Sequence, residues 1–102
     1  MPEKRLTLHS LFERAAEPYN AHVYFQPPSK MEFPAIRYKK AKIENGFADN
    51  LVYSQKQYYD VTVIEKDPEK PLTSLISKFP GIQWVTGFIK DNLYHEQFTL
   101  YY

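Results

Sequence analysis

Hydrophobic residues recur with helical spacing in two short stretches of the chain. Near the N-terminus, the positions i, i+3, i+4 and i+7 are filled by Leu8, Leu11, Phe12 and Ala15. This spacing predicts an amphipathic helix over residues 6–16, with Ser10 and Glu13 placed as in a capping box and Pro18 ending the helix. The same spacing returns between Pro71 and Pro80 in Leu72, Leu75, Ile76 and Phe79, which predicts a second, shorter helix.

Elsewhere the β-branched and aromatic residues fall in runs that are typical of strands. Five such runs are separated by proline, glycine or asparagine: residues 21–25, 33–43, 52–66, 82–90 and 93–102. Asp91-Asn92 tolerates positive φ and predicts a tight turn between the last two strands. Glu44 to Leu51 holds few strand formers and is predicted to be a loop.

The predicted order of elements is αβββαββ. It indicates the α+β class, with an antiparallel sheet of about four to five strands and two short helices packed on one face. There is no internal repeat and no low-complexity tract, so residues 1–102 are interpreted as a single domain.

One predicted strand is too long for so small a core. Residues 52–66 contain neither proline nor glycine and could form a strand of about 14 residues, against the usual 5 or 6. Only its second half, around Tyr59, Val61 and Val63, has the pattern of a packed strand. We therefore predict that the first half projects as part of a β-hairpin arm.

A projecting two-stranded arm exposes apolar side chains and unpaired backbone groups, which favours contact with another subunit. The alternative is a loose hairpin with scattered aromatic residues. The candidate interface residues are Phe47, Asp49, Asn50, Leu51, Val52, Tyr53, Gln55, Gln57 and Tyr58.

The composition of the chain limits the kinds of chemistry and of partner that can be expected. The chain has no cysteine, which removes disulfides and thiolate chemistry, and its formal charge of +1 gives no long-range attraction to a polyanion. Aromatic residues make up 17% of the chain, and tyrosine suits half-buried positions at protein contacts. No apolar run approaches the roughly 20 residues that cross a bilayer, and the N-terminus lacks a signal-peptide core, so we expect a soluble chain that does not contact a membrane.

Catalytic motifs are missing from the sequence. His9 and Glu13 share a predicted helix face, but a metal needs further ligands, and His22 and His95 are interpreted as ordinary strand residues. No serine lies in a nucleophile elbow, and three glycines leave no phosphate loop. We expect no enzyme activity, no metal and no cofactor; a small hydrolase or metal enzyme is the least favoured alternative.

A basic cluster lies on the predicted strand 33–43. Arg37, Lys39, Lys40 and Lys42 surround Tyr38, so the cations could contact phosphate while the ring stacks on a base. This is the alternative of a nucleic-acid-binding module. Because the total charge is balanced, we favour a solvated sheet edge that lysines protect from aggregation, or a basic lining of a lumen.

Several stretches together resemble a family of small neck proteins of tailed bacteriophages and prophages, the tail terminator or tail completion proteins. They cover the chain from about residue 21 to the end: Val23-Tyr-Phe-Gln-Pro-Pro28, Phe33-Pro-Ala-Ile-Arg-Tyr38, Phe47-Ala-Asp-Asn50, Tyr59-Asp-Val-Thr-Val-Ile-Glu-Lys-Asp-Pro68 and Asp91-Asn-Leu-Tyr-His-Glu-Gln-Phe-Thr-Leu-Tyr-Tyr102.

The resemblance implies a structural virion protein that forms a ring, usually a hexamer, on the head-proximal end of the tail tube. Its implied partners are further copies of itself, the major tail tube protein and the head–tail connector or head-closure protein, with DNA only as cargo passing through the lumen. It implies a place in the virion neck, and in the host cytoplasm during assembly. The rival within this resemblance is a head-closure or tail-to-head joining subunit on the capsid side of the same joint.

Overall fold

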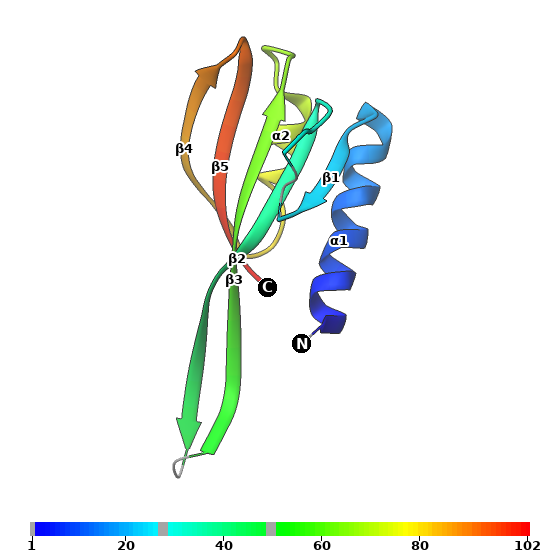
Figure 1. Cartoon of the computed structure of the whole chain (residues 1–102). Coiled ribbons are helices and arrows are strands. Elements are labelled where there is room, and N and C mark those ends of the chain that lie inside the picture. Colours follow the sequence, from blue (N-terminus) through cyan, green and yellow to red (C-terminus); the bar gives the residue numbers. More distant parts are fainter. Residues whose placement is uncertain (1, 27–28, 49–50) are drawn as a thin grey trace.

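A computed structural model describes the backbone of residues 2–26, 29–48 and 51–102, and the side chains of residues 5–26, 29–41 and 57–102. The elements follow the predicted order: α1 (Pro2–Ala16), a 3₁₀ turn η1 (Glu17–Tyr19), β1 (His22–Phe25), β2 (Ala35–Ala48), β3 (Leu51–Glu65), α2 (Pro71–Ile76), β4 (Ile82–Lys90) and β5 (Leu93–Tyr101). The strands form one sheet in the order β1-β2-β3-β5-β4. Figure 1 shows α2 behind the sheet and α1 alongside β1. The predicted α+β class is confirmed.

The sheet is mixed, whereas the sequence predicted an antiparallel one. β1 runs parallel to β2, and the other three strand pairs are antiparallel. After β1 the chain returns to the start of that strand before β2 begins, and the His22 N–H donates to the Pro34 carbonyl at 2.9 Å. The direction of a short strand depends on the path of its connection, which the residue pattern of the strand does not record.

Details of both predicted helices are wrong. α1 begins at Pro2 and not at residue 6, but it ends at Ala16 as predicted. Pro18 follows in η1, where its missing N–H costs nothing. Ser10 is no cap, because it lies inside α1 and its hydroxyl donates to the Leu6 carbonyl. Phe79 follows α2, whose last residue is Ile76.

The predicted loop at residues 44–51 is mostly strand. β2 continues to Ala48 and β3 starts at Leu51, with Asn45 opposite Gln55 and Gly46 opposite Ser54. Cross-strand pairing therefore outweighs the weak strand propensity of these residues. The prediction of a long strand over residues 52–66 is confirmed by β3.

The core lies between the two helices and one face of the sheet. Phe12 of α1 is at its centre, stacked on Phe79 with ring centroids 5.5 Å apart and edge-on to Tyr38 at 5.2 Å. The rest of the buried cluster comes from both helices and three strands: Leu8, Ala15, Ala16, Ile36, Tyr59, Val61, Val63, Leu72, Ile76, Phe98 and Leu100. Removal of this apolar surface from water holds the helices on the sheet.

Half of β3 lies outside this layered body. β5 pairs with β3 only from Tyr58 to Glu65, so among the described strands residues 51–56 pair with β2 alone. We call this two-stranded segment, residues 42–48 and 51–56, the arm. It continues well below the body in Figure 1, and the molecule measures 52 × 26 × 24 Å. Ala41, a bulged residue between Lys40 and Lys42, marks its base.

No helix in the described ranges, 2–26, 29–48 and 51–102, has the length and apolar character needed to cross a bilayer.

A buried carboxylate fastens α2 to the sheet. Glu65, at the end of β3, is 3% exposed and accepts hydrogen bonds from the backbone N–H groups of Leu72 and Thr73 at 2.8 and 2.9 Å and from the Thr73 hydroxyl. These are N–H groups that the first turn of a helix cannot satisfy internally.

We expect Glu65→Ala to lower the free energy of unfolding by about 1–3 kcal/mol, because buried donors of α2 lose their acceptor. Urea denaturation followed by circular dichroism measures the change. The matched control is Glu69→Ala on the exposed connector, for which we expect little effect. Equal stabilities of the two variants would show that the Glu65 bonds do not hold α2.

Candidate subunit interface

Seven of the nine predicted interface residues are described in the structure, and they lie on the arm or at its base. Phe47, Leu51, Val52, Tyr53 and Gln55 occupy the arm strands, although their side chains lie outside the described ones. Asp49 and Asn50 lie outside the described residues altogether.

The last two predicted interface residues, Gln57 and Tyr58, mark the junction of the arm with the body. The Gln57 carbonyl accepts a bond from the Tyr102 N–H at 3.0 Å, and the Tyr58 ring packs against Tyr101 with centroids 5.4 Å apart. β5 thus ends where the arm begins, and the rings of Tyr58 and Tyr101 cover the junction.

Strand β4 is a second candidate contact surface, which the sequence analysis missed. It is the last strand of the sheet and pairs only with β5 among the described strands. Every residue from Gln83 to Lys90 is exposed, and they include four large apolar side chains: Trp84 at 57%, Val85, Phe88 and Ile89 at 67%. A strand rich in apolar residues at an open edge is a typical site for pairing with another chain.

The sequence did carry a signal for this surface. Trp84-Val85 and Phe88-Ile89 are adjacent apolar pairs, and adjacent residues of a strand point to opposite faces. Because the helices cover only one face of a two-layer domain, a strand that is apolar on both faces leaves part of its apolar surface uncovered. In the structure Val85 is also a bulge, since Trp84 pairs with Phe98 and Thr86 with Gln97.

A buried carboxylate holds the side chain of Trp84. Glu96 of β5 accepts a bond from the Trp84 indole Nε1–H at 2.7 Å and another from the Lys70 ammonium at 2.6 Å. The Lys70 ammonium also lies 5.1 Å from the Tyr94 ring centroid. Gly87 makes room for this carboxylate, because a Cβ at that position would clash with Glu96 Oε2.

Electrostatics in this cluster favour the ion pair. Burial would raise the pKa of Glu96, but the hydrogen bonds from Lys70 and Trp84 outweigh it, so the net pKa of Glu96 is lowered. The bond to Glu96 likewise raises the pKa of Lys70. Trp84 is therefore fixed to the sheet on its polar side while its ring stays exposed on β4.

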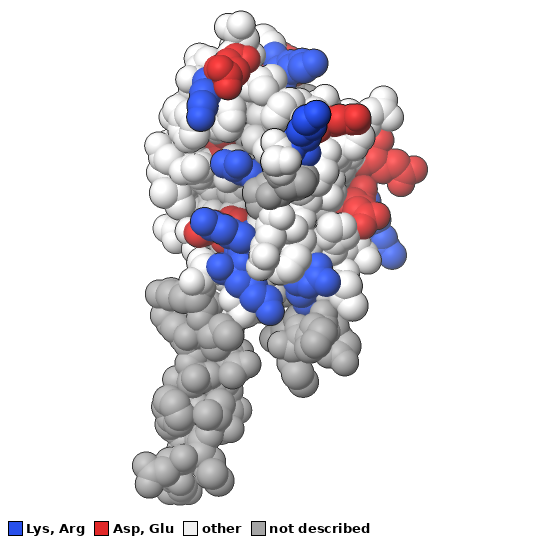
Figure 2. All heavy atoms as spheres, in the orientation of Figure 1, with Lys and Arg blue, Asp and Glu red and all other residues white. Residues whose placement is uncertain are grey.

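The basic cluster does not form one patch. Arg37 and Lys39 lie on the sheet face away from the helices, where Lys39 is opposite Asp60, whereas Lys40 is opposite the core residue Tyr59 and points to the other face. Strand alternation separates them. The side chain of Lys42 is outside the described ones. Figure 2 shows Lys and Arg side chains on the part of the body above the arm and acidic ones along the flank that carries α1.

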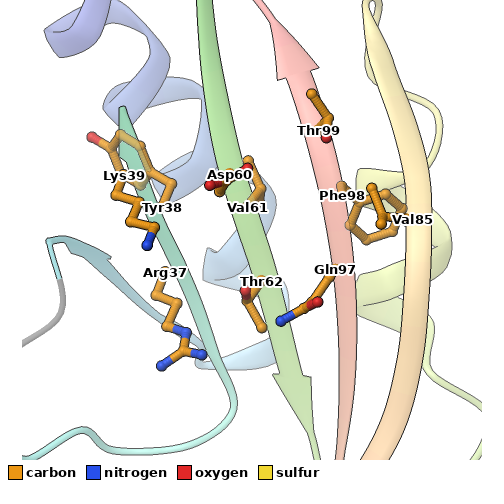
Figure 3. A pocket seen from close by; sticks show the side chains of 10 residues that line it. All are labelled: Arg37, Tyr38, Lys39, Asp60, Val61, Thr62, Val85, Gln97, Phe98 and Thr99. Carbon is orange, nitrogen blue, oxygen red and sulfur yellow. The ribbon is translucent and has the colours of Figure 1, made fainter. Parts of the chain in front are cut away.

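The face away from the helices holds a shallow hollow of about 370 Å³. Residues of four strands line it, and Figure 3 labels them: Arg37, Tyr38, Lys39, Asp60, Val61, Thr62, Val85, Gln97, Phe98 and Thr99. Of these, Tyr38, Val61 and Phe98 belong to the buried core cluster. It mixes cations with a carboxylate, amide and hydroxyl groups and offers no single charge to a ligand.

Tyr38 cannot stack on a base, because it is 1% exposed. Its hydroxyl lies 2.7 Å from His9 Nδ1, and burial raises its pKa. His9 Nε2 lies 2.9 Å from Glu13, which places the predicted surface pair one helical turn apart and links it to the core. The nucleic-acid alternative thereby loses its stacking residue.

The other two histidines lie apart from this pair. His22 Nε2 is 3.2 Å from Glu32, and the His95 ring stacks on Phe88 at 4.9 Å. Within the described part of the chain, no three His, Asp or Glu side chains gather in a group that could hold a metal ion.

We expect the fluorescence of Trp84, the single tryptophan, to titrate with Glu96. Because the pKa of Glu96 is lowered, its bonds contribute fully above the ordinary glutamate value of 4.5 and are lost as the pH falls through the lower, folded value. The emission change should therefore have its midpoint below 4.5.

Lys70→Met should move this midpoint upward, since one of the two bonds that oppose burial is removed. The exposed Lys66→Met is the matched control and should leave the midpoint unchanged. A wild-type midpoint above the ordinary value, or no response to Lys70→Met, would contradict the assignment.

Comparison with known proteins shows no family: no family model matches the chain, and no curated protein matches its sequence. The arm and the edge of β4 are therefore the two surfaces that bear on the function.

Proposed function

We propose that this chain is a structural subunit of a tailed-phage virion, a tail terminator that forms a ring on the head-proximal end of the tail tube. The proposal joins the resemblance of residues 21–102 to a shape that suits ring assembly. In this role the subunit needs no enzyme activity, metal or cofactor. Its partners are further copies of itself, the tail tube protein and the head–tail connector, with DNA passing through the lumen.

The arm is the observation that carries the proposal. An isolated two-stranded ribbon is marginally stable in water, since its strands have no third neighbour and no core of their own. Here residues 51–56 of β3 pair with β2 alone and extend from a body that already has a complete core. Such a segment gains its stability from a neighbouring molecule.

The body and the arm divide two tasks of a terminator between them. The body, in which the helices pack on the sheet, forms the rigid part of each subunit. The arm reaches from one body toward the next. A contact between two different surfaces repeats head to tail, and when the rotation closes it gives a ring that cannot grow. One side of such a ring matches the last layer of the tube, and the other side must not match a further tube subunit.

The rival role is a head-closure or tail-to-head joining subunit on the capsid side of the neck. It would use the same ring and the same arm. The two roles differ in what happens to the tail when the protein is missing, because only a terminator limits the addition of tube subunits.

We expect deletion of the gene in the phage that encodes it to give headless tails that are abnormally long and variable in length, as seen by negative-stain electron microscopy. Supplying the chain from a plasmid should restore tails of uniform length. Tails of normal length beside separate heads would refute termination and support the head-closure role.

A version that lacks residues 43–55 tests whether the arm is needed. Its body should keep the core and fold, as judged by circular dichroism, but it should fail to restore tail length. Full restoration by this shortened chain would remove the arm as the basis of the proposal.

A further inference from the structure

The outer edge of β4 lacks the features that normally protect an edge strand. From Gln83 to Lys90 no described strand pairs with this edge, and β4 contains no proline and a single charged residue, Lys90, at its end. Natural proteins guard such edges with inward charges, prolines or short strands. β4 is long and apolar on both faces, so the edge is suited to being paired in the working assembly.

The arm carries the matching backbone edges. Residues 42–48 of β2 and 51–56 of β3 each have an outer edge that no described strand pairs with. Their lengths are close to that of the stretch that β4 offers. By sequence the arm brings aromatic and aliphatic residues to such a contact, namely Ile43, Phe47, Leu51, Val52 and Tyr53.

The arm cannot reach β4 of its own molecule. β5 lies between β3 and β4 in the sheet, and the arm begins where β5 ends, at the pair Tyr58–Tyr101. In Figure 1 the arm points away from the body that holds β4. The two sets of unpaired edges can therefore meet only between different molecules.

We propose that β4 of one copy receives the arm of a second copy as an added strand, so that the sheet continues from subunit to subunit. This inference rests on the ring proposed above and names the surface that accepts the arm. Main-chain hydrogen bonds would hold the added strand, and the exposed Trp84 and Ile89 would pack against its side chains. Donor and acceptor differ, so the contact is head to tail and each subunit uses it twice.

The bonds that Glu96 accepts from Trp84 and Lys70 prepare β4 for this contact. Glu96 fixes the indole of Trp84, which reduces the rotamer freedom that the ring would otherwise lose on binding. Aromatic residues held in this way are typical of the positions that contribute most to protein interfaces.

Chemical cross-linking tests the pairing directly, because the chain has no native cysteine. Single-cysteine variants of the full chain are mixed in pairs and treated with a short bismaleimide: Thr86→Cys on β4 with Asn45→Cys on β2, and Thr86→Cys with Gln55→Cys on β3. Asn45 and Gln55 are opposite each other in the arm, so reaction of either variant places the arm beside β4, and the variant that gives the higher yield indicates the added strand. Lys78→Cys, exposed beyond α2, replaces Thr86→Cys in the control mixture.

We expect a cross-linked dimer between Thr86→Cys and one of the arm variants, and none with Lys78→Cys. A dominant product between two copies of Thr86→Cys would overturn the proposal, because it shows β4 pairing with itself about a two-fold axis. Absence of any product between β4 and the arm would also overturn it, whether the chain is oligomeric or monomeric at the concentration used.

A charge on the edge provides a second test. Ile89→Lys should weaken self-association by about tenfold or more in sedimentation velocity, because a lysine on the edge opposes strand addition. Leu6→Lys is the matched control: Leu6 is 53% exposed on α1, against 67% for Ile89, and its replacement should change little. Equal effects of the two substitutions would count against β4.

The outcomes separate this inference from the proposed function. Rings or other oligomers that form without cross-linking between β4 and the arm refute the strand addition and leave termination standing. Cross-linking as expected, together with tails of normal length in the gene deletion, refutes termination and leaves the strand addition standing.

Discussion

The structure depends on one strand that must satisfy its backbone hydrogen bonds in two different settings. From Tyr58 to Ile64, β3 is paired on both sides, with β2 and β5, and its alternate residues Val61 and Val63 enter the core. From Leu51 to Lys56 the same strand is paired with β2 alone. The rigidity of the first half positions the second, so the direction of the arm is set by the sheet in the body.

Three buried polar side chains of the body, Glu65, Tyr38 and Glu96, hold the elements around β3 in place. Glu65 ends the strand and bonds the first turn of α2, while Tyr38 on the neighbouring strand bonds His9 of α1. In both cases a buried polar group has a partner from a helix, so the helices are positioned on the sheet as well as packed against it. The lowered pKa of Glu96 reflects the same principle at the far edge, where Lys70 and Trp84 meet on one carboxylate. These bonds make the body a stable base for two surfaces that remain without partners among the described residues.

The pattern of residues along the chain predicted one of the two candidate interface surfaces, the arm, but not the other, the edge of β4. The long run without proline or glycine in β3 was enough to predict an arm, because a strand of that length exceeds what a small core can cover. The edge strand β4 was missed, since its position at the end of the sheet depends on which strands pair, and β5 lies between β3 and β4 against the order along the chain. Likewise the basic cluster looked continuous in the sequence but is divided between two faces, with Tyr38 buried between them.

The sequence by itself determined the kinds of elements, their order and the α+β class, because helical and strand periodicities are local properties of the chain. It also determined the turn at Asp91-Asn92, where both residues adopt the positive φ expected of them. Only the tertiary structure decided that β1 runs parallel to β2, that residues 44–48 belong to a strand, and that β4 is left at an edge with exposed apolar residues. Each of these depends on hydrogen bonds between segments distant in the chain, and such pairing is not encoded in the pattern of any one segment.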